Sequence, residues 1–230
     1  MDKNIGPAGG DTAYTIGIID SSQVDRMDIQ VSVMENMGQG CNIKFKEYNT
    51  GNGKDALLGE VQRDIENGLV TGLITEHRIT LTSAVLDGDE VFCFVKEKAP
   101  EFPVVILTHD PDKAREGPNT DPDKVYEKKI FLDPELDETK KMVFKIIHNM
   151  CRYAMARQDL EDALTKAVQA CAGIGQETDD ASAAQKVFML AEGLSRYRPV
   201  SPAPVALRID IGELKQAAVQ LKKYIKSTTV

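Results

Sequence analysis

The sequence lacks several features that would place it quickly in a class of proteins. It contains no tryptophan, and aromatic residues make up only 6% of its 230 positions. No apolar run approaches the roughly 18 residues of a membrane-spanning helix, and the first residues lack the apolar core of a signal peptide. These absences argue against a membrane-embedded or secreted protein, and we expect a soluble protein of the cytoplasm that does not bind membranes.

Cysteine and the common catalytic motifs are also sparse. The four cysteines are far apart and form no Cys-x-x-Cys pair, which argues against a zinc site or a redox centre. The sequence has no phosphate-binding loop, no Gly-x-Ser-x-Gly and no His-Glu-x-x-His. We therefore predict a protein that is not an enzyme and needs no cofactor.

Acidic residues outnumber basic ones, 36 to 28, which gives the chain a net charge of −8. The excess of acid falls within residues 1–150, whereas residues 151–230 carry a slight excess of base. An acidic front half is a poor surface for DNA or RNA, because the nucleic-acid backbone is negatively charged. Nucleic acid is therefore not an expected partner of that part.

Short apolar runs alternate along the chain with segments of helical periodicity. Ser22 can cap the first such segment, in which Val24, Met27, Val31 and Met34 recur at helical spacing. The expected strands comprise residues 14–20, 41–50, 69–76, 103–110 and 128–137, and the expected helices residues 21–40, 51–68 and 83–102. This alternation predicts a parallel sheet with helices on both faces.

The carboxyl ends of these strands are where such a sheet carries its working site. They supply Asp20, Glu76, Thr108 and Asp133. The stretch His109–Lys129 contains three prolines and many charges where a fourth helix would be expected, so a loop or a degraded helix is predicted there.

Four segments, in the same order, resemble parts of the receiver domain of bacterial response regulators. They are "IIDSS", "NTGNGKDAL", "LDGDEVFCFVKEKAPEFPVVILT" and "IFLDP". The resemblance covers residues 14–150. It implies an α/β fold with a flavodoxin-like, doubly wound, five-stranded parallel sheet, followed here by an α-helical extension. It also implies a place in two-component signal transduction.

The departures from the receiver pattern concern the phosphorylation site. The resemblance implies two Mg²⁺-binding acids after the first strand, and here Ser21 follows Asp20. Glu76 replaces the phosphoacceptor aspartate, Thr108 fits the family's hydroxyl residue, and Asp133 stands where the family has lysine. The segment between Glu76 and Asp87 is also longer than in the family. Without the lysine, each like-charge contact to a phosphoryl group would cost on the order of 1–4 kcal/mol. We therefore predict a degenerate receiver, a pseudo-receiver, that is not phosphorylated.

Other roles for these residues remain open at this point. Three carboxylates could hold Mg²⁺ or Ca²⁺, or they could lie apart, solvated or at helix N-termini, which we favour. His77 and His109 beside Glu76 would suit a transition metal, although no His-x-His or His-x-x-x-His spacing supports one. His148 is a candidate phosphotransfer residue, but no acidic residue follows it directly.

The back third of the sequence is predicted to be helical. From Leu136 to Gly173 there is no interior glycine or proline, so the last helix of the domain should continue well beyond it. A second helix is expected over 181–197 and a last one from Asp210, with a basic end. The heptad pattern of the long helix predicts a coiled-coil homodimer interface formed by Val143, Ile147, Met150, Ala154, Leu164 and Val168.

The sequence thus predicts a Gly-rich flexible leader over 1–13, a receiver-like domain over 14–150 and a helical dimerisation or effector region over 151–230. The expected function is non-catalytic signalling, with the pseudo-receiver acting as a protein-interaction module for itself and an unidentified protein partner. Three alternatives remain: a nucleic-acid-binding regulator acting through the C-terminal helices, an atypical phosphorylatable regulator, and a small-molecule binder at the strand ends. Nothing marks Val230 as a natural end, so a longer protein also stays open.

Overall fold

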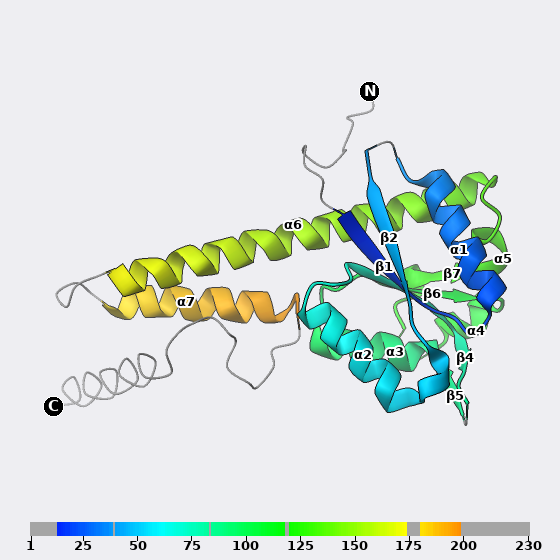
Figure 1. Cartoon of the computed structure of the whole chain (residues 1–230), viewed down its shortest axis with the longest axis horizontal. Helices are drawn as coiled ribbons and strands as arrows, with labels where there is room; N and C mark the ends of the chain where they lie inside the picture. The colour runs from blue at the N-terminus through cyan, green and yellow to red at the C-terminus, as the bar shows by residue number, and fades with distance from the viewer. Residues whose placement is uncertain (1–12, 39, 83, 118–119, 174–179, 199–230) are drawn as a thin grey trace. The chain divides into compact units, whose positions relative to one another are not determined.

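The computed structural model describes residues 13–38, 40–82, 84–117, 120–173 and 180–198 (Figure 1). These form two compact units. The first comprises the described residues between 13 and 157 together with 196–198, and the second comprises residues 158–173 and 180–195. None of the helices in these ranges combines the length and the apolar character needed to cross a membrane. Residues 1–12 of the predicted leader and the predicted last helix from Asp210 lie outside the described residues, while Ala13, the last residue of that leader, begins a strand.

Strands and helices alternate through the first unit. The strands are β1 (Ala13–Ile19), β2 (Asn42–Glu47), β3 (Gly72–Glu76), β4 (Arg78–Thr80), β5 (Val85–Asp87), β6 (Val104–Thr108) and β7 (Val125–Glu127). The helices are α1 (Gln23–Asn36), α2 (Lys54–Glu66), α3 (Gly88–Lys98), α4 (Pro111–Arg115), α5 (Lys128–Phe131), α6 (Asp137–Gly173) and α7 (Asp180–Ser195). Two short 3₁₀ helices, η1 (Thr50–Asn52) and η2 (Pro122–Lys124), complete the described elements.

Five strands form one all-parallel sheet in the order β2-β1-β3-β6-β7. The predicted fold class is therefore confirmed: an α/β, flavodoxin-like parallel sheet followed by helices. Strands β4 and β5 form a separate antiparallel pair, with Ile79 opposite Leu86. This hairpin accounts for the additional length between Glu76 and Asp87.

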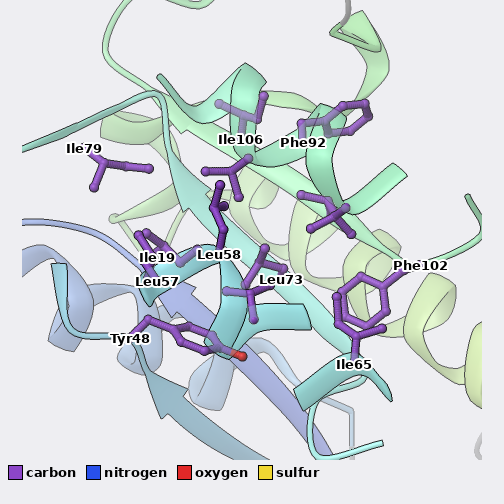
Figure 2. Close-up of a cluster of buried hydrophobic side chains, with 14 of the residues drawn as sticks. Ile19, Tyr48, Leu57, Leu58, Ile65, Leu73, Ile79, Phe92, Phe102 and Ile106 are labelled. Carbon is purple, nitrogen blue, oxygen red and sulfur yellow. The ribbon is translucent and has the colours of Figure 1, made fainter. Parts of the chain in front are cut away.

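The sheet is buried on both faces, as its continuous apolar strands predict. Neighbouring residues of one strand point to opposite sides, so Leu73 packs with α2 and α3 while Ile74 packs with α1 and the first half of α6. Figure 2 shows the first of these two cores, in which Tyr48 and Phe102 lie among aliphatic side chains. Burying one such large side chain stabilises the fold by roughly 1.5–3 kcal/mol.

One expectation about local structure is corrected. The predicted fifth strand over 128–137 is wrong, because the edge strand is β7, and α5 and a turn follow it. In the stretch His109–Lys129, for which the sequence predicts a loop or a degraded helix, the described residues contain the five-residue helix α4, then η2, β7 and the start of α5. Only Val125 of β7 is fully buried, which is why a three-residue strand left little trace in the sequence.

Helix α1 packs through a different face from the one that its apolar residues suggest. Its N-terminus is as expected, with the Ser22 hydroxyl accepting from the Asp25 backbone N–H. The side buried against the sheet carries Ile29, Ser32 and Val33. The side exposed to solvent carries the residues at helical spacing: Val24, Met27, Val31 and Met34 are 66%, 57%, 45% and 47% exposed. We call these four residues the α1 stripe.

The long helix α6 agrees with the one predicted from Leu136 to Gly173. Its first half belongs to the core of the first unit, where Val143 and Met150 are completely buried and Ile147 nearly so. Ala154 packs against the same core. The prediction of a dimer interface is therefore wrong for Val143, Ile147 and Met150, because the core of their own chain covers them, and Ala154 is partly covered by the same core.

The second unit contains the end of α6 and helix α7. A Cβ placed at Gly193 of α7 would contact Leu160 of α6 at 3.6 Å, so the two helices pack closely there (Figure 1). Leu164, another residue assigned to a dimer interface, is only 3% exposed, and Val168 is half-buried. Leu164 is therefore not available to a second chain in this conformation.

Candidate functional site

Four polar residues meet at the carboxyl ends of adjacent strands. Asp20 follows β1, Glu76 ends β3, Thr108 ends β6, and Lys128 follows β7. These four strands are neighbours and parallel, so the four residues share one edge of the sheet. Asp20, Thr108 and Lys128 are almost fully buried. For the two charged residues, Asp20 and Lys128, such burial is unusual unless the charges are paired.

Lys128 lies at the centre of this group. Its Nζ is 2.8 Å from Asp20 Oδ2, 2.5 Å from Asp25 Oδ2 and 3.1 Å from Glu76 Oε1. The lysine side chain is 1% exposed, as is that of Asp20, while those of Asp25 and Glu76 are 23% and 17% exposed. One buried cation therefore faces three carboxylates. We call Lys128, Asp20, Asp25 and Glu76 the Lys128 cluster.

The cluster perturbs the ionisation of its members. Burial alone would lower the pKa of Lys128, but the hydrogen bonds that its ammonium donates to the carboxylates of Asp20 and Asp25, together with the charges of Asp20 and Glu76, raise that pKa above its ordinary value. Burial raises the pKa of Asp20 in spite of its contact with Lys128. For Asp25 burial also acts upward, but the hydrogen bond and charge of Lys128 outweigh it and lower the pKa. The lysine is therefore held in its charged form.

Both carboxylate oxygens of Glu76 are occupied. Oε1 accepts from Lys128 Nζ at 3.1 Å, and Oε2 accepts from the Ser21 hydroxyl at 2.7 Å and from the Ser21 backbone N–H at 3.2 Å. The backbone N–H and the hydroxyl of Ser21 thus fix the orientation of the Glu76 carboxylate. A serine does this without adding another negative charge to the cluster.

The loop between β1 and α1 holds the two aspartates in place. Asp20 Oδ1 accepts from the Ser22 backbone N–H at 2.8 Å, and the Asp20 carbonyl accepts from Arg26 Nη1 at 2.7 Å. Because Ser22 caps α1, Asp25 lies in the first turn of that helix, where a negative charge is favourable. The cap therefore brings Asp25 within reach of Lys128.

Thr108 is buried at the end of β6, and its hydroxyl accepts from the Asp110 backbone N–H at 3.1 Å. Asp110 in turn caps α4 by accepting from the Lys113 N–H. The hydroxyl therefore fixes the chain where β6 passes into α4, on the same sheet edge as the Lys128 cluster.

The assignment of Asp133 to this site is wrong. Asp133 is exposed in the turn after α5, where its carboxylate accepts from the Glu135 backbone N–H at 3.1 Å. The residue that directly follows the fifth strand of the sheet is Lys128, so a lysine lies at the carboxyl end of that strand. A strand predicted at Val125–Glu127 would have placed Lys128 at this end of the sheet. The apolar residues 130–132 gave the stronger indication of a strand, and they placed it too late in the sequence.

Asp25 was also missed. The pattern Ser22-x-x-Asp25 is a helix-capping signature, and it predicts an acid in the first turn. It does not predict that this acid reaches a lysine more than a hundred positions later. The sequence therefore predicts the cap of α1, but only the fold shows that Asp25 contacts Lys128.

No described histidine belongs to a group of potential metal ligands. In the described ranges, the one group of three potential metal ligands is Asp20, Asp25 and Glu76. His109 is exposed, and His148 stacks on the Phe144 ring with 6.0 Å between ring centroids. The transition-metal alternative therefore has no geometric support among the residues described.

The three carboxylates offer oxygens within 4.8 Å of one another, a spacing that a hard cation could bridge. The ammonium group of Lys128 already contacts all three of them. A divalent ion would have to compete with a buried lysine whose charge these carboxylates stabilise. The residues therefore fit the lysine better than Mg²⁺, and no role of a metal follows from them.

No protein-family model matches this chain, and no curated protein matches it significantly. Its function is therefore argued from the fold and from the residues at the strand ends.

Proposed function

We propose that this protein is a non-catalytic signalling protein whose receiver-like domain works as a protein-interaction module without being phosphorylated. The observation that carries the proposal is the contact of Lys128 with Glu76 at the edge of the sheet. In a domain of this type, a lysine at this place pairs with the phosphoryl group. Here the side chain of Glu76, one methylene longer than that of an aspartate, places a permanent negative charge beside Lys128.

The geometry of Glu76 also disfavours its use as a nucleophile. A phosphoacceptor needs a carboxylate oxygen free to attack, and a site that neutralises the incoming charge. Both oxygens of Glu76 are engaged, one by Lys128 and one by Ser21. The cation is shared among three carboxylates, so little positive charge remains for a phosphoryl group.

One alternative gains support from the cluster. Asp20, Thr108 and Lys128 are all in place, which is more of a phosphorylation site than the sequence suggested. An atypical phosphorylatable regulator would use Glu76 as the acceptor and would have to release Lys128 from it first. Chemistry with a small phosphodonor separates the two functions.

We expect no change in intact mass when the protein is incubated with acetyl phosphate and Mg²⁺. The matched variant Glu76→Asp shortens the side chain by one methylene, withdraws the carboxylate from Lys128 and leaves the charge unchanged. An added phosphoryl mass on the wild type that Glu76→Ala abolishes would refute the proposal. Labelling of Glu76→Asp alone would support it, since side-chain length would then be what keeps the site silent.

The α1 stripe is the interaction surface that we assign to this module. Its four apolar residues follow a 3-4-3 spacing along the exposed side of α1. That spacing suits a second helix lying alongside α1, because the four side chains form one continuous apolar strip that the apolar face of the second helix can cover. The Lys128 cluster touches the start of the same helix through Asp25, which links the site to the surface.

Homodimerisation is a further part of the proposal. In the second unit Phe188 and Met189 of α7 are 69% and 63% exposed, whereas Leu164 is covered. We expect light scattering to give a mass twice the 25.3 kDa of one chain. Phe188→Asp with Met189→Asp should reduce it to one chain, and the exposed pair Lys186→Asp with Glu192→Lys serves as a control. A wild-type mass of one chain at micromolar concentration would end the dimer proposal.

A further inference from the structure

A pocket of about 320 Å³ lies in the first unit at the amino ends of the strands, opposite the ends that carry the Lys128 cluster. It is lined by Gly72 and Val104, the first residues of β3 and β6, whereas Glu76 and Thr108 end the same strands. Residues of α6 and the described segment 196–198 complete the wall. Its volume is at the lower end of the range of pockets that bind small molecules.

One side of the pocket is apolar and aromatic. Leu73, Ile146 and Ala156 contribute aliphatic surface. The rings of Tyr153 and Tyr197 stack with 5.8 Å between centroids and an angle of 29°, and the Tyr153 hydroxyl donates to the Tyr197 carbonyl. This fixed aromatic wall suits a flat, apolar group about the size of one ring.

Most of the charged side chains in the lining are basic. Lys96, Lys124 and Arg152 contribute three cations, and the one carboxylate, Glu101, is ion-paired with Arg196. Burial lowers the pKa of Lys96, and the nearby charge of Lys124 lowers it further. The pocket thus gathers positive charge in a protein whose net charge is negative. Exposed charges elsewhere on a protein surface are ordinarily of mixed sign.

Several of these polar groups are available to a ligand. The Lys96 ammonium donates to the carbonyls of Pro100 and Phe102 at 3.0 and 2.8 Å, so it is committed to the fold. The side chains of Lys124, Asn149 and Arg152, by contrast, make no hydrogen bond or ion pair with any residue in the described ranges. Two cations and an amide donor therefore face the same pocket with unused hydrogen-bonding capacity.

We propose that this pocket binds a small organic anion with a ring-sized apolar body. Its phosphate or carboxylate group is held by Lys124, Arg152 and Asn149, and its body lies against Tyr153 and Tyr197. Paired cations and an amide donor provide the charge-assisted hydrogen bonds that such a head group needs. This site is separate from the Lys128 cluster and does not depend on the function proposed above.

Phenyl phosphate is a suitable probe, with inorganic phosphate and benzyl alcohol as its separated halves. We expect titration of the full chain, followed by ¹⁵N amide NMR, to show saturable shifts near Gly72 and Asn149, with a Kd below about 1 mM. Each half should bind at least about tenfold more weakly. Equal affinity for inorganic phosphate or for benzyl alcohol would overturn the assignment, as would shifts that fail to saturate by about 10 mM.

Two kinds of variant locate the site. Lys124→Gln with Arg152→Gln should weaken phenyl phosphate at least about tenfold, because two charge-assisted contacts are lost. Lys44→Gln with Lys113→Gln removes the same charge from exposed positions elsewhere and should change the affinity less than about twofold. Ala156→Phe fills the pocket without changing charge and should abolish the shifts. Unchanged affinity in the first double variant, or in a folded Ala156→Phe protein, would refute the site.

Discussion

Lys128→Met is expected to destabilise the protein by about 3–5 kcal/mol. Methionine retains the length of the side chain but removes the cation that faces three carboxylates. Asp20 is then left almost completely buried beside two other acids, with no opposite charge. Chemical denaturation followed by circular dichroism would measure the loss in the free energy of unfolding.

Lys129→Met is the matched control, because Lys129 is exposed and should cost less than about 0.5 kcal/mol. Adding Asp20→Asn to Lys128→Met should recover part of the loss. The deficit of Lys128→Met should also shrink as the pH falls from about 7 to about 5. Burial raises the pKa of the Asp20 carboxyl in the folded state. A group whose pKa is higher in the folded than in the unfolded state binds its proton more tightly when folded, so a fall in pH stabilises the folded state. A deficit that grows in acid would contradict this explanation.

Gly88→Ala is expected to be the next most damaging change, with a loss of about 3 kcal/mol. A Cβ at Gly88 would lie 2.3 Å from the Glu76 carbonyl oxygen and 3.0 Å from His77 Cα. Both neighbours are backbone, so neither can rotate away. The Gly88 N–H also donates to the His77 carbonyl at 2.7 Å, which ties the start of α3 to the end of β3.

This prediction concerns the site as well as the fold, because relief of the clash would move Glu76 from Lys128. Gly38→Ala is the control, since nothing lies within 4 Å of a Cβ there, and its effect should be below about 1 kcal/mol. Thermal denaturation of both variants makes the comparison. Equal stability of Gly88→Ala and wild type would show that β3 and α3 do not meet as closely as described.

The fold could be predicted because its central strands are long and apolar. β1, β3 and β6 are buried on both faces, and each leaves a continuous apolar run in the sequence. β7 is a three-residue edge strand with one buried side chain, so its sequence resembles a loop. The stronger apolar run after it belongs to α5, where Phe131 is completely buried in the core.

The same error misplaced the centre of the site. A lysine is rarely buried unless it is paired, so nothing in the sequence around Lys128 distinguishes it from its neighbour Lys129. Helical spacing in α1 likewise identified an apolar face but could not say which side the sheet covers. Burial of Ile29 and Val33 settles that, and it leaves the α1 stripe in solvent. Pairing and burial are properties of the fold, and local sequence does not contain them.

The central claim of the proposed function is that the charge of Glu76 pairs with Lys128 in place of a phosphoryl group. A double-mutant cycle of unfolding free energies over Lys128→Met and Glu76→Gln measures that pairing directly, because glutamine keeps the shape of Glu76 and removes its charge. We expect a coupling energy of at least about 1 kcal/mol between the two positions, as for residues in one buried network. A coupling energy within about 0.3 kcal/mol of zero would mean that Lys128 is not committed to Glu76, and it would contradict the proposed mechanism.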